Sequence, residues 1–352
     1  MVIWKKNVQN TVIILICTGE IMSAFNIWVT EKCNLSCSYC YEDKKRYIDM
    51  DDEVLEKTVS FIRENMEQSK TNIANFHGGE PLLAIDSIMK IIKLCNKIGK
   101  FNYSLTTNGT IVNDFVLDEL KKNHVYVSLS IDGTKEIHDF NRKNYNGSGT
   151  YNTAIKCLKA LQDRDINVRV RMTVTPETVS VIYNSVMSIA DLHAETIVAM
   201  IDLYDDRWTD SLLDVLKEQL IMIHMDLQKR KKSEFSFYSD LKMKKKGLCD
   251  GGITNFNISA DGIIYPCTCL VNDKEYMIGS VFKGIDDNLL YKHKVYYDKR
   301  NITCNGCKNE YTCLSKRCKY INKSLTGEYL TASPIICRLE HIMHSIRLLY
   351  ND

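Results

Sequence analysis

Three closely spaced cysteines near the start of the chain have the residue type and spacing of metal ligands. Cys33, Cys37 and Cys40 lie within the stretch EKCNLSCSYCYED. Disulfides use cysteines in pairs, and closed zinc or iron–sulfur sites use four protein ligands. A loop with this spacing can bind three irons of a cubane cluster and leave the fourth iron open, as catalytic metal sites do. The alternative is a structural site whose fourth ligand is distant in the sequence.

These cysteines and four later motifs resemble the radical AdoMet superfamily. The spacing C-x3-C-x2-C follows a predicted strand and contains Tyr39. HGGEP (77–81), TTNGT (106–110) and SIDG (130–133) follow the next predicted strands, and IHDFNR ends at Arg142. In this family the free iron chelates S-adenosylmethionine (AdoMet), and one electron converts AdoMet to a 5′-deoxyadenosyl radical. The resemblance implies that the protein positions the reactants and excludes water.

The resemblance also assigns roles at AdoMet to individual residues. Glu80 would receive the ammonium group, and Gly78 and Gly79 would let backbone polar groups approach the ligand. Ser130 and Asp132 would meet the ribose and the carboxylate. The rest of the implied AdoMet set is Tyr39, Arg142 at the carboxylate and Leu203 at the adenine. Each motif alone is also an ordinary turn sequence, and no residue identifies the catalytic base.

A second group of cysteines occupies the last third of the chain. Its pattern, C-x12-G-x4-C, then C-x2-C-x5-C-x4-C and a final cysteine, resembles the SPASM domain, which holds two auxiliary [4Fe–4S] clusters. The departure is x4 before Cys318, where the family usually has x3. By analogy, one cluster would take Cys304, Cys307, Cys313 and Cys337. The other would take Cys249, Cys267 and Cys318; either Cys269 substitutes as its fourth ligand, or the site is open and could bind substrate. Zinc ribbons are the structural alternative.

Alternating strand and helix patterns predict the scaffold that positions these motifs. Strands are predicted at 25–30, 72–77, 102–107, 125–130, 167–174 and 195–200. Helices are predicted between them at 51–65, 85–98, 113–123, 151–164 and 177–190. Strict alternation indicates βα units and a parallel sheet, whose carboxyl ends carry the site. The predicted fold class is α/β: a partial (β/α)6 radical AdoMet barrel followed by a small Cys-rich SPASM domain.

Composition changes suggest where the domains begin and end. Residues 1–21 contain a short apolar segment, TVIILIC, and are predicted to be a disordered leader or to precede the true start at Met22. The barrel is predicted at 22–230, and it ends with a helix at about 208–230. A basic linker follows at 231–247. The SPASM domain is then predicted at 248–352, closed by a helix near 338–350.

Charge and cysteine usage limit the setting and the partners. The chain has 352 residues, 46 basic against 44 acidic residues, and 14 cysteines. The near-zero balance argues against nucleic acid or an anionic membrane as a partner. Because the cysteines cluster in two places, metal thiolates are favoured over disulfides. We therefore expect a cytoplasmic, reducing and anaerobic setting.

The resemblance implies an enzyme with AdoMet and three [4Fe–4S] clusters as cofactors. Auxiliary clusters suit the two-electron oxidation of a peptide or protein substrate, with a low-potential ferredoxin or flavodoxin as electron donor. We expect a peptide maturase that forms a thioether or other cross-link, aided by a separate leader-binding protein. The alternative is an anaerobic sulfatase maturase that forms formylglycine. Thr268, His77 and Thr106 stand where those maturases commonly carry Asp, Gln and Gln. A non-catalytic electron-transfer protein is the alternative of another class.

Overall fold

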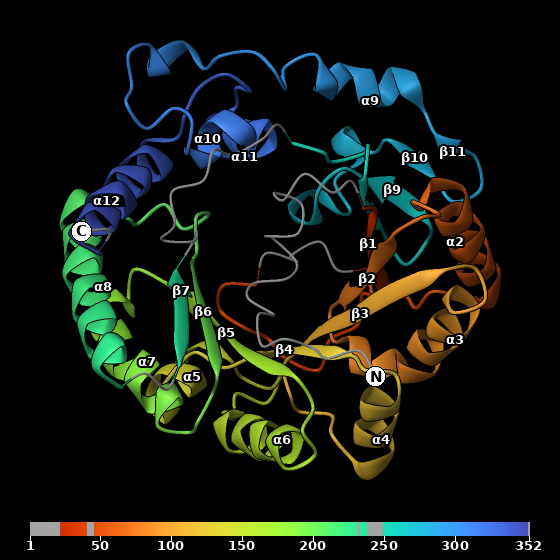
Figure 1. The fold of residues 1–352 in the computed structure, drawn as a ribbon, viewed down its shortest axis with the longest axis horizontal. Coiled ribbons are helices and arrows are strands. Elements are labelled where there is room, and N and C mark those ends of the chain that lie inside the picture. The colour runs from red at the N-terminus through yellow and green to blue at the C-terminus, as the bar shows by residue number, and fades with distance from the viewer. Residues whose placement is uncertain (1–21, 41–45, 231–232, 238–248, 351–352) are drawn as a thin grey trace.

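A largely parallel sheet forms the centre of the protein, and its curvature makes an open barrel (Figure 1). The structure is a computed structural model that describes residues 22–40, 46–230, 233–237 and 249–350. Within these residues, the strand order is β11-β10-β9-β8-β1-β2-β3-β4-β5-β6-β7, so β11 and β7 are the two free edges. The sequence-ordered strands are β1 (Ala24–Thr30), β2 (Thr71–Gly78), β3 (Lys100–Thr107), β4 (Tyr126–Ser130), β5 (Val168–Val174) and β6 (Thr196–Ile201).

These six strands pair in parallel, as the alternating pattern predicted. The structure adds two parallel strands that the sequence reading missed. β7 (Glu234–Phe237) pairs with β6, and β8 (Asn255–Ile258) pairs with β1. β7 lies inside the segment 231–247 predicted as a linker, so that part of the prediction is corrected. The remaining strands are antiparallel: β9 (Ile263–Tyr265), β10 (Gly279–Ser280) and β11 (Gly284–Ile285).

Helices cover the outside of the barrel. In chain order they are α2 (Asp52–Asn65), α3 (Ile85–Cys95), α4 (Asp114–Lys122), α5 (Lys135–Asn141), α6 (Tyr151–Asp163), α7 (Ile182–Ala190) and α8 (Asp210–Arg230). Local capping explains several starts: the Asp51 side chain accepts from the Val54 amide, and Asn113 caps α4 in the same way. The short helix α5 was not predicted.

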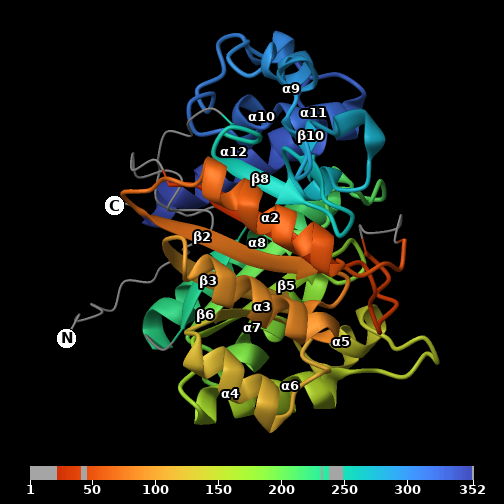
Figure 2. The ribbon, with the colours of Figure 1, turned by 90° about the vertical axis from the view of Figure 1, so that its right-hand side faces the viewer.

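The C-terminal part contains α9 (Asp287–Lys294), α10 (Leu314–Arg317), α11 (Lys319–Thr326) and α12 (Pro334–Tyr350). Figure 2 shows α9, α10 and α11 at the end of the molecule opposite α4 and α6. The last helix begins four residues before the predicted 338. It lies beside α8, where Arg338 pairs with Asp214 at 2.5 Å. The predicted leader at 1–21 lies outside the described residues.

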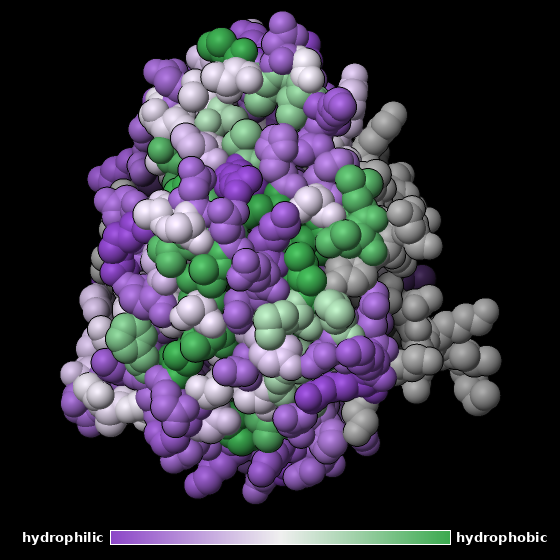
Figure 3. Space-filling view, turned by 90° about the vertical axis from the view of Figure 1, so that its left-hand side faces the viewer, coloured by the Kyte–Doolittle hydropathy of each residue, from purple (hydrophilic) through white to green (hydrophobic). Residues whose placement is uncertain are grey.

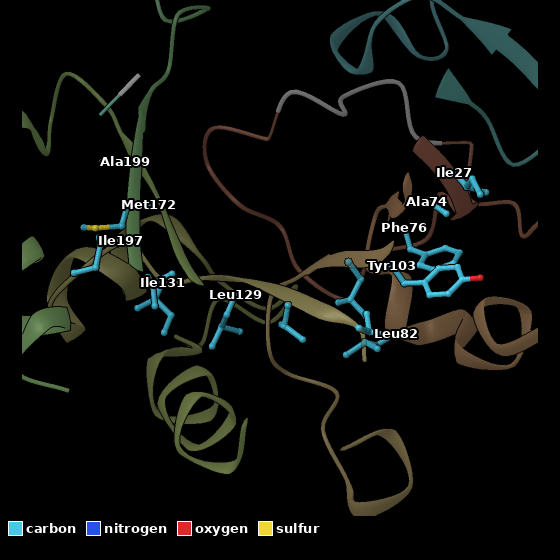
Figure 4. Packing of buried hydrophobic residues seen from close by; sticks show 14 of the residues in the cluster. Ile27, Ala74, Phe76, Leu82, Tyr103, Leu129, Ile131, Met172, Ile197 and Ala199 are labelled. Carbon is cyan, nitrogen blue, oxygen red and sulfur yellow. The ribbon is translucent and has the colours of Figure 1, made fainter. Parts of the chain in front are cut away.

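Side chains of the barrel strands alternate between an apolar outer face and a polar inner face. On β5, the buried Val170, Met172 and Val174 belong to the core under the helices. Figure 4 shows the same packing for Met172 on β5, Leu129 on β4 and Phe76 on β2. Arg169 and Arg171 alternate with these residues and therefore face the interior of the barrel. A polar interior is unusual for a packed barrel and leaves room for ligands.

The outer surface mixes apolar and polar side chains. Met222 and Met225 on α8 and Leu348 and Leu349 on α12 are exposed. On the face shown in Figure 3, apolar patches are separated by hydrophilic residues. Among the described helices, none combines the length and the apolar character that a membrane span requires.

Candidate functional site

The first three cysteines lie on the loop after β1, whose residues 31–40 we call the cluster loop. Cys33, Cys37 and Cys40 are all partly exposed. The Leu35 amide donates to Cys33 Sγ at 3.4 Å. Burial raises the pKa of Cys37 to about 11, a cost that a bound cation removes when it deprotonates the thiol.

The donor set of the cluster loop suits a cluster better than a single ion. In the part of the chain that the structure describes, no three His, Cys, Asp or Glu side chains converge as ligands of one metal ion do. A cubane cluster binds each thiolate to a different iron, so its ligands need not converge. Three partly exposed thiols on one loop therefore fit such a cluster.

A glycine pair at the end of β2 seats the cluster loop. Gly78 has φ +129°, and a Cβ there would lie 1.9 Å from the Thr30 carbonyl oxygen. A Cβ on Gly79 would lie 2.2 Å from the carbonyl oxygen of Lys32. The Glu80 amide then donates to that same oxygen at 2.8 Å. The close approaches that require the two glycines are thus to the end of β1 for Gly78 and to the cluster-loop backbone for Gly79.

Glu80 is buried and forms hydrogen bonds with residues at the end of β3. Its carboxylate accepts from Thr107 Oγ1 at 2.7 Å, from the Asn108 amide at 2.7 Å and from the Leu82 amide at 3.1 Å. Burial outweighs these hydrogen bonds and raises the pKa of Glu80 to about 7. The carboxylate therefore has a structural task at the TTNGT turn, in addition to the ligand role expected from the sequence.

Asp132 joins the cluster loop to the rest of the site. Its carboxylate accepts from Tyr39 Oη at 2.5 Å, from Arg142 Nε at 3.0 Å and Nη2 at 3.2 Å, and from the Thr173 amide at 3.0 Å. The Arg142 guanidinium also lies 5.3 Å from the centre of the Tyr39 ring. Because the Asp132 side chain is fully enclosed, it acts on a ligand through Tyr39 and Arg142.

Two further expected AdoMet contacts lie near the same edge of the barrel. Ser130 is the last residue of β4 and lies opposite Arg171 in the strand register. Leu203 is buried just after β6. The cluster loop is also fixed to the TTNGT turn, since Asn34 Nδ2 donates to Thr110 Oγ1 at 2.8 Å. Of the expected AdoMet residues, Gly79, Glu80, Asp132 and Arg142 contact the cluster loop, whereas Ser130 and Leu203 lie at the ends of β4 and β6; the contacting four are seen in hydrogen bonds or close approaches.

The C-terminal cysteines form two groups. One small cavity has four of them in its wall, together with Glu340 and His341; the four are Cys304, Cys307, Cys313 and Cys337. They are the four expected to share a cluster.

The other group surrounds a cluster of buried tyrosines. Cys249, Cys267 and Cys318 pack against this cluster. The thiols of Cys267 and Cys269 are hydrogen-bonded to each other. Burial, followed by the nearby Cys249 and Cys269, raises the pKa of Cys318 to about 12. Cys269 therefore belongs to this group of cysteines.

One large cavity connects the cluster loop with the C-terminal cysteines. It has a volume of about 770 Å³, and its wall includes Tyr39 and Cys40 on one side and Thr268 and Cys269 on the other. Asp202 also contributes to the wall, and burial raises the pKa of its carboxyl. The cavity is large enough to hold AdoMet and part of a substrate.

Sequence reasoning missed the two arginines inside the barrel. Arg169 Nε donates to Ser128 Oγ at 3.1 Å, and its guanidinium lies 5.7 Å from the centre of the Tyr126 ring. Arg171 follows two residues later on the same face of β5. The alternating sequence VRVRMTV was the available signal, because a charged residue at every second position of a covered strand needs an interior space.

Comparisons with known proteins agree with this geometry. A family model described as the radical SAM superfamily matches residues 27–186. An uncharacterized protein of Methanocaldococcus jannaschii is 33% identical over 150 residues, which cover 42% of this chain and about half (51%) of that protein. A cysteine-type anaerobic sulfatase-maturating enzyme of Clostridium perfringens (strain 13 / Type A) is 27% identical over 278 residues, 71% of this chain and 74% of that enzyme. The radical SAM cyclopropyl synthase TigE of Paramaledivibacter caminithermalis is 25% identical over 226 residues, 59% of this chain and 47% of that enzyme.

Solved structures share the fold. Native anSMEcpe with bound AdoMet and Cp18Cys peptide superposes with a TM-score of 0.78 at 22% identity, over 93% of this chain and 96% of that chain. Streptococcus suis SuiB bound to the precursor peptide SuiA gives a TM-score of 0.69 at 15% identity, over 89% and 75%. The matched residues 27–186 hold the cluster loop and the strands around it, so this part of the chain is a radical SAM domain.

Proposed function

We propose that this enzyme oxidises a residue of a ribosomally made peptide and so forms a thioether or other cross-link. The observation that carries the proposal is the shared cavity. Its wall contains Tyr39 and Cys40 of the cluster loop and Thr268 and Cys269 of the C-terminal cysteine group. A peptide side chain in this cavity would lie between the AdoMet site and the cysteine group that contains Cys267 and Cys269. A two-electron oxidation needs that arrangement, because the hydrogen atom leaves on one side and the second electron on the other.

The cluster loop would hold the first [4Fe–4S] cluster through Cys33, Cys37 and Cys40. When bound, the cluster and AdoMet supply the radical that takes a hydrogen atom from the substrate. The chain's own task is to position and enclose them. Arg142 uses Nε and Nη2 on Asp132, which leaves Nη1 to donate to the AdoMet carboxylate.

The other expected AdoMet residues divide into contact and positioning roles. Tyr39, Ser130 and Leu203 would contact AdoMet. Glu80 would meet its ammonium group while it holds the TTNGT turn. Asp132 would act as a positioning residue, since its carboxylate is enclosed by Tyr39, Arg142 and the β5 backbone.

The C-terminal cysteines would hold two auxiliary [4Fe–4S] clusters. Cys304, Cys307, Cys313 and Cys337 would bind one, and Cys249, Cys267, Cys269 and Cys318 the other. We include in the proposal a low-potential ferredoxin or flavodoxin as electron donor, a separate leader-binding protein, and the reducing cytoplasm as the setting that keeps these thiols available.

Formation of formylglycine on a sulfatase is the second candidate function. Two observations favour it: the alignment with the Clostridium perfringens enzyme covers 74% of that enzyme, and the anSMEcpe structure has the higher TM-score. Thr268 argues against it, because the resemblance places an aspartate base at that position of the cavity wall in sulfatase maturases. The two candidates differ in their substrate and product, so one assay can separate them.

The experiment is an anaerobic reaction of the reconstituted enzyme with dithionite and AdoMet. Formation of 5′-deoxyadenosine supports a radical SAM reaction and excludes a purely electron-transferring protein. A sulfatase-type Cys peptide and a Cys-rich peptide encoded near the gene are then offered in parallel. Loss of two hydrogens from the Cys-rich peptide supports the proposal. Conversion of the sulfatase-type peptide alone to the formylglycine mass overturns it.

A further inference from the structure

Two arginines face the barrel interior at the level of the AdoMet site. Arg171 lies opposite Ser130, the last residue of β4, and Arg169 lies opposite Ser128, two pairs deeper. Residues two apart on a strand are about 7 Å from each other and point the same way. The barrel therefore presents two guanidinium groups to one interior space.

These positive charges have only neutral partners. Arg169 is held by the Ser128 hydroxyl and the face of the Tyr126 ring. Among the described residues, neither guanidinium forms an ion pair, and the Arg171 side chain has no hydrogen-bond partner. Arg142, in contrast, is neutralised by Asp132. Two like charges side by side in a partly buried place oppose folding, unless an anion compensates them.

The field of the two arginines extends across the barrel. Burial, followed by the positive charges of Arg171 and Arg169, lowers the pKa of His77 on β2 to about 3. His77 stacks on Trp28, with ring centres 5.2 Å apart, and Trp28 is part of the cavity wall. Arg169 and Arg171 thus act on a ring that packs against the cavity wall, although neither arginine is part of that wall.

We infer that Arg169 and Arg171 form a carboxylate-binding subsite for the substrate, so that the modified peptide carries an acidic side chain or its own C-terminal carboxylate beside the reacting residue. This inference rests on the proposed function, whose peptide substrate it narrows. Guanidinium groups bind carboxylates through paired, charge-assisted hydrogen bonds. Arg169 is already oriented by Ser128 and Tyr126, while Arg171 keeps its donors free for the ligand.

The carboxylate of AdoMet is the other possible source of the anion. Arg142 and Ser130 are available to that group at the edge of the barrel. Arg169 lies two residue pairs deeper than Ser130, on the side away from the strand ends. We therefore assign the carboxylate to the substrate.

The test compares two tripeptides that differ only in charge, acetyl-Gly-Glu-Gly-amide and acetyl-Gly-Gln-Gly-amide. Binding to the reconstituted, AdoMet-loaded enzyme is measured by NMR titration without reductant, so the result does not depend on turnover. We expect the Glu peptide to bind about ten- to hundredfold more tightly, the range for hydrogen bonds to charged groups. Equal binding of the two peptides to the wild type overturns the inference, even if 5′-deoxyadenosine forms.

Variants identify the residues responsible. In Arg171→Met the preference for the Glu peptide should disappear, and in Arg171→Lys part of it should remain. Arg164→Met is the matched control, because Arg164 pairs with Asp114 on the outer surface; this variant should keep the full preference.

AdoMet affinity is measured by equilibrium dialysis in the same variants. It should stay within about threefold of the wild type in Arg171→Met. If AdoMet affinity falls while the Glu preference persists, the arginines serve AdoMet and the inference is overturned.

Discussion

Replacing Asp132 by Asn should release the cluster loop from the barrel. The carboxylate of Asp132 accepts hydrogen bonds from Tyr39 of the cluster loop, from Arg142 at the end of α5 and from the backbone amide of Thr173 on β5. The substitution keeps the shape of the side chain but removes its charge. It also turns one acceptor into an amide donor, which faces donors on every side.

The size of the effect follows from burial. The Arg142 side chain is 9% exposed and the Asp132 side chain is 0% exposed. Removing one partner of a buried ion pair leaves the other charge uncompensated and costs about 3–5 kcal/mol. The cost disappears when the segment around Arg142 opens to water, so local opening becomes easier by about two to three and a half powers of ten.

Hydrogen exchange measures this opening directly. The amide of Ser36 donates to the Lys143 carbonyl at 2.8 Å, and the amide of Ser38 donates to the Asn141 carbonyl at 2.9 Å. Both amides are protected only while the cluster loop stays on the segment that carries Arg142. Their exchange in Asp132→Asn should be about a hundred- to a few thousandfold faster than in the wild type.

A surface pair supplies the matched control. Asp214→Asn removes the partner of Arg338, in a pair whose side chains are 56% and 42% exposed, and such pairs contribute about 0–1 kcal/mol. Exchange of the two loop amides should not change in this variant. If Asp132→Asn also leaves them within about threefold of the wild type, the reasoning about the buried pair is wrong.

Three further predictions follow from contacts described above. Gly79→Ala should lower iron binding at the cluster loop, because a Cβ would lie 2.2 Å from cluster-loop backbone. Ser60→Ala, at an exposed position of α2, should bind iron like the wild type, and equal iron in both variants contradicts the steric argument. Burial lowers the pKa of His138 to about 4, so as pH falls from 7 to 5 only the unfolded state takes up a proton on this histidine. The free energy of unfolding should therefore fall by about 2 kcal/mol between pH 7 and pH 5. Urea titrations should show a smaller fall in His138→Gln, and an unchanged fall would refute this. Cys304→Ala should lose about four irons per reconstituted chain by iron analysis, while Cys95→Ala, in the barrel core, should lose none.

Much of the barrel could be predicted because its strands are long and alternate with helices. β1 to β6 have five to eight residues each, and their apolar outer faces are visible in the sequence. β7 and β8 escaped prediction because each has four residues and β7 lies next to a basic run. The pairing of β8 with β1 joins residues about 230 positions apart, and Asn26 Nδ2 supports it by donating to Asn257 Oδ1 at 2.9 Å. Contacts of this range have no local signal in the sequence.

The candidate site was partly predictable for a similar reason. The motifs around the cluster loop were correctly expected at one edge of the barrel, because carboxyl ends of parallel strands meet there. The partner of each side chain was not predictable. Asp132 was expected to touch AdoMet, yet the structure encloses it between Tyr39 and Arg142. Arg171 was missed, since a turn motif marks a strand end but nothing marks a single charge inside a barrel.

The pairing of β8 with β1 also bears on how the chain is made. A ribosome releases β1 more than two hundred residues before β8. Until then, β1 has hydrogen-bonding groups exposed along one side, beside strands that are already able to fold. A nascent or truncated chain that ends near residue 230 is therefore expected to attract other extended chains at that edge. Besides supplying cysteines, the C-terminal part is therefore expected to reduce aggregation, because β8 pairs with the edge of β1 that would otherwise be exposed.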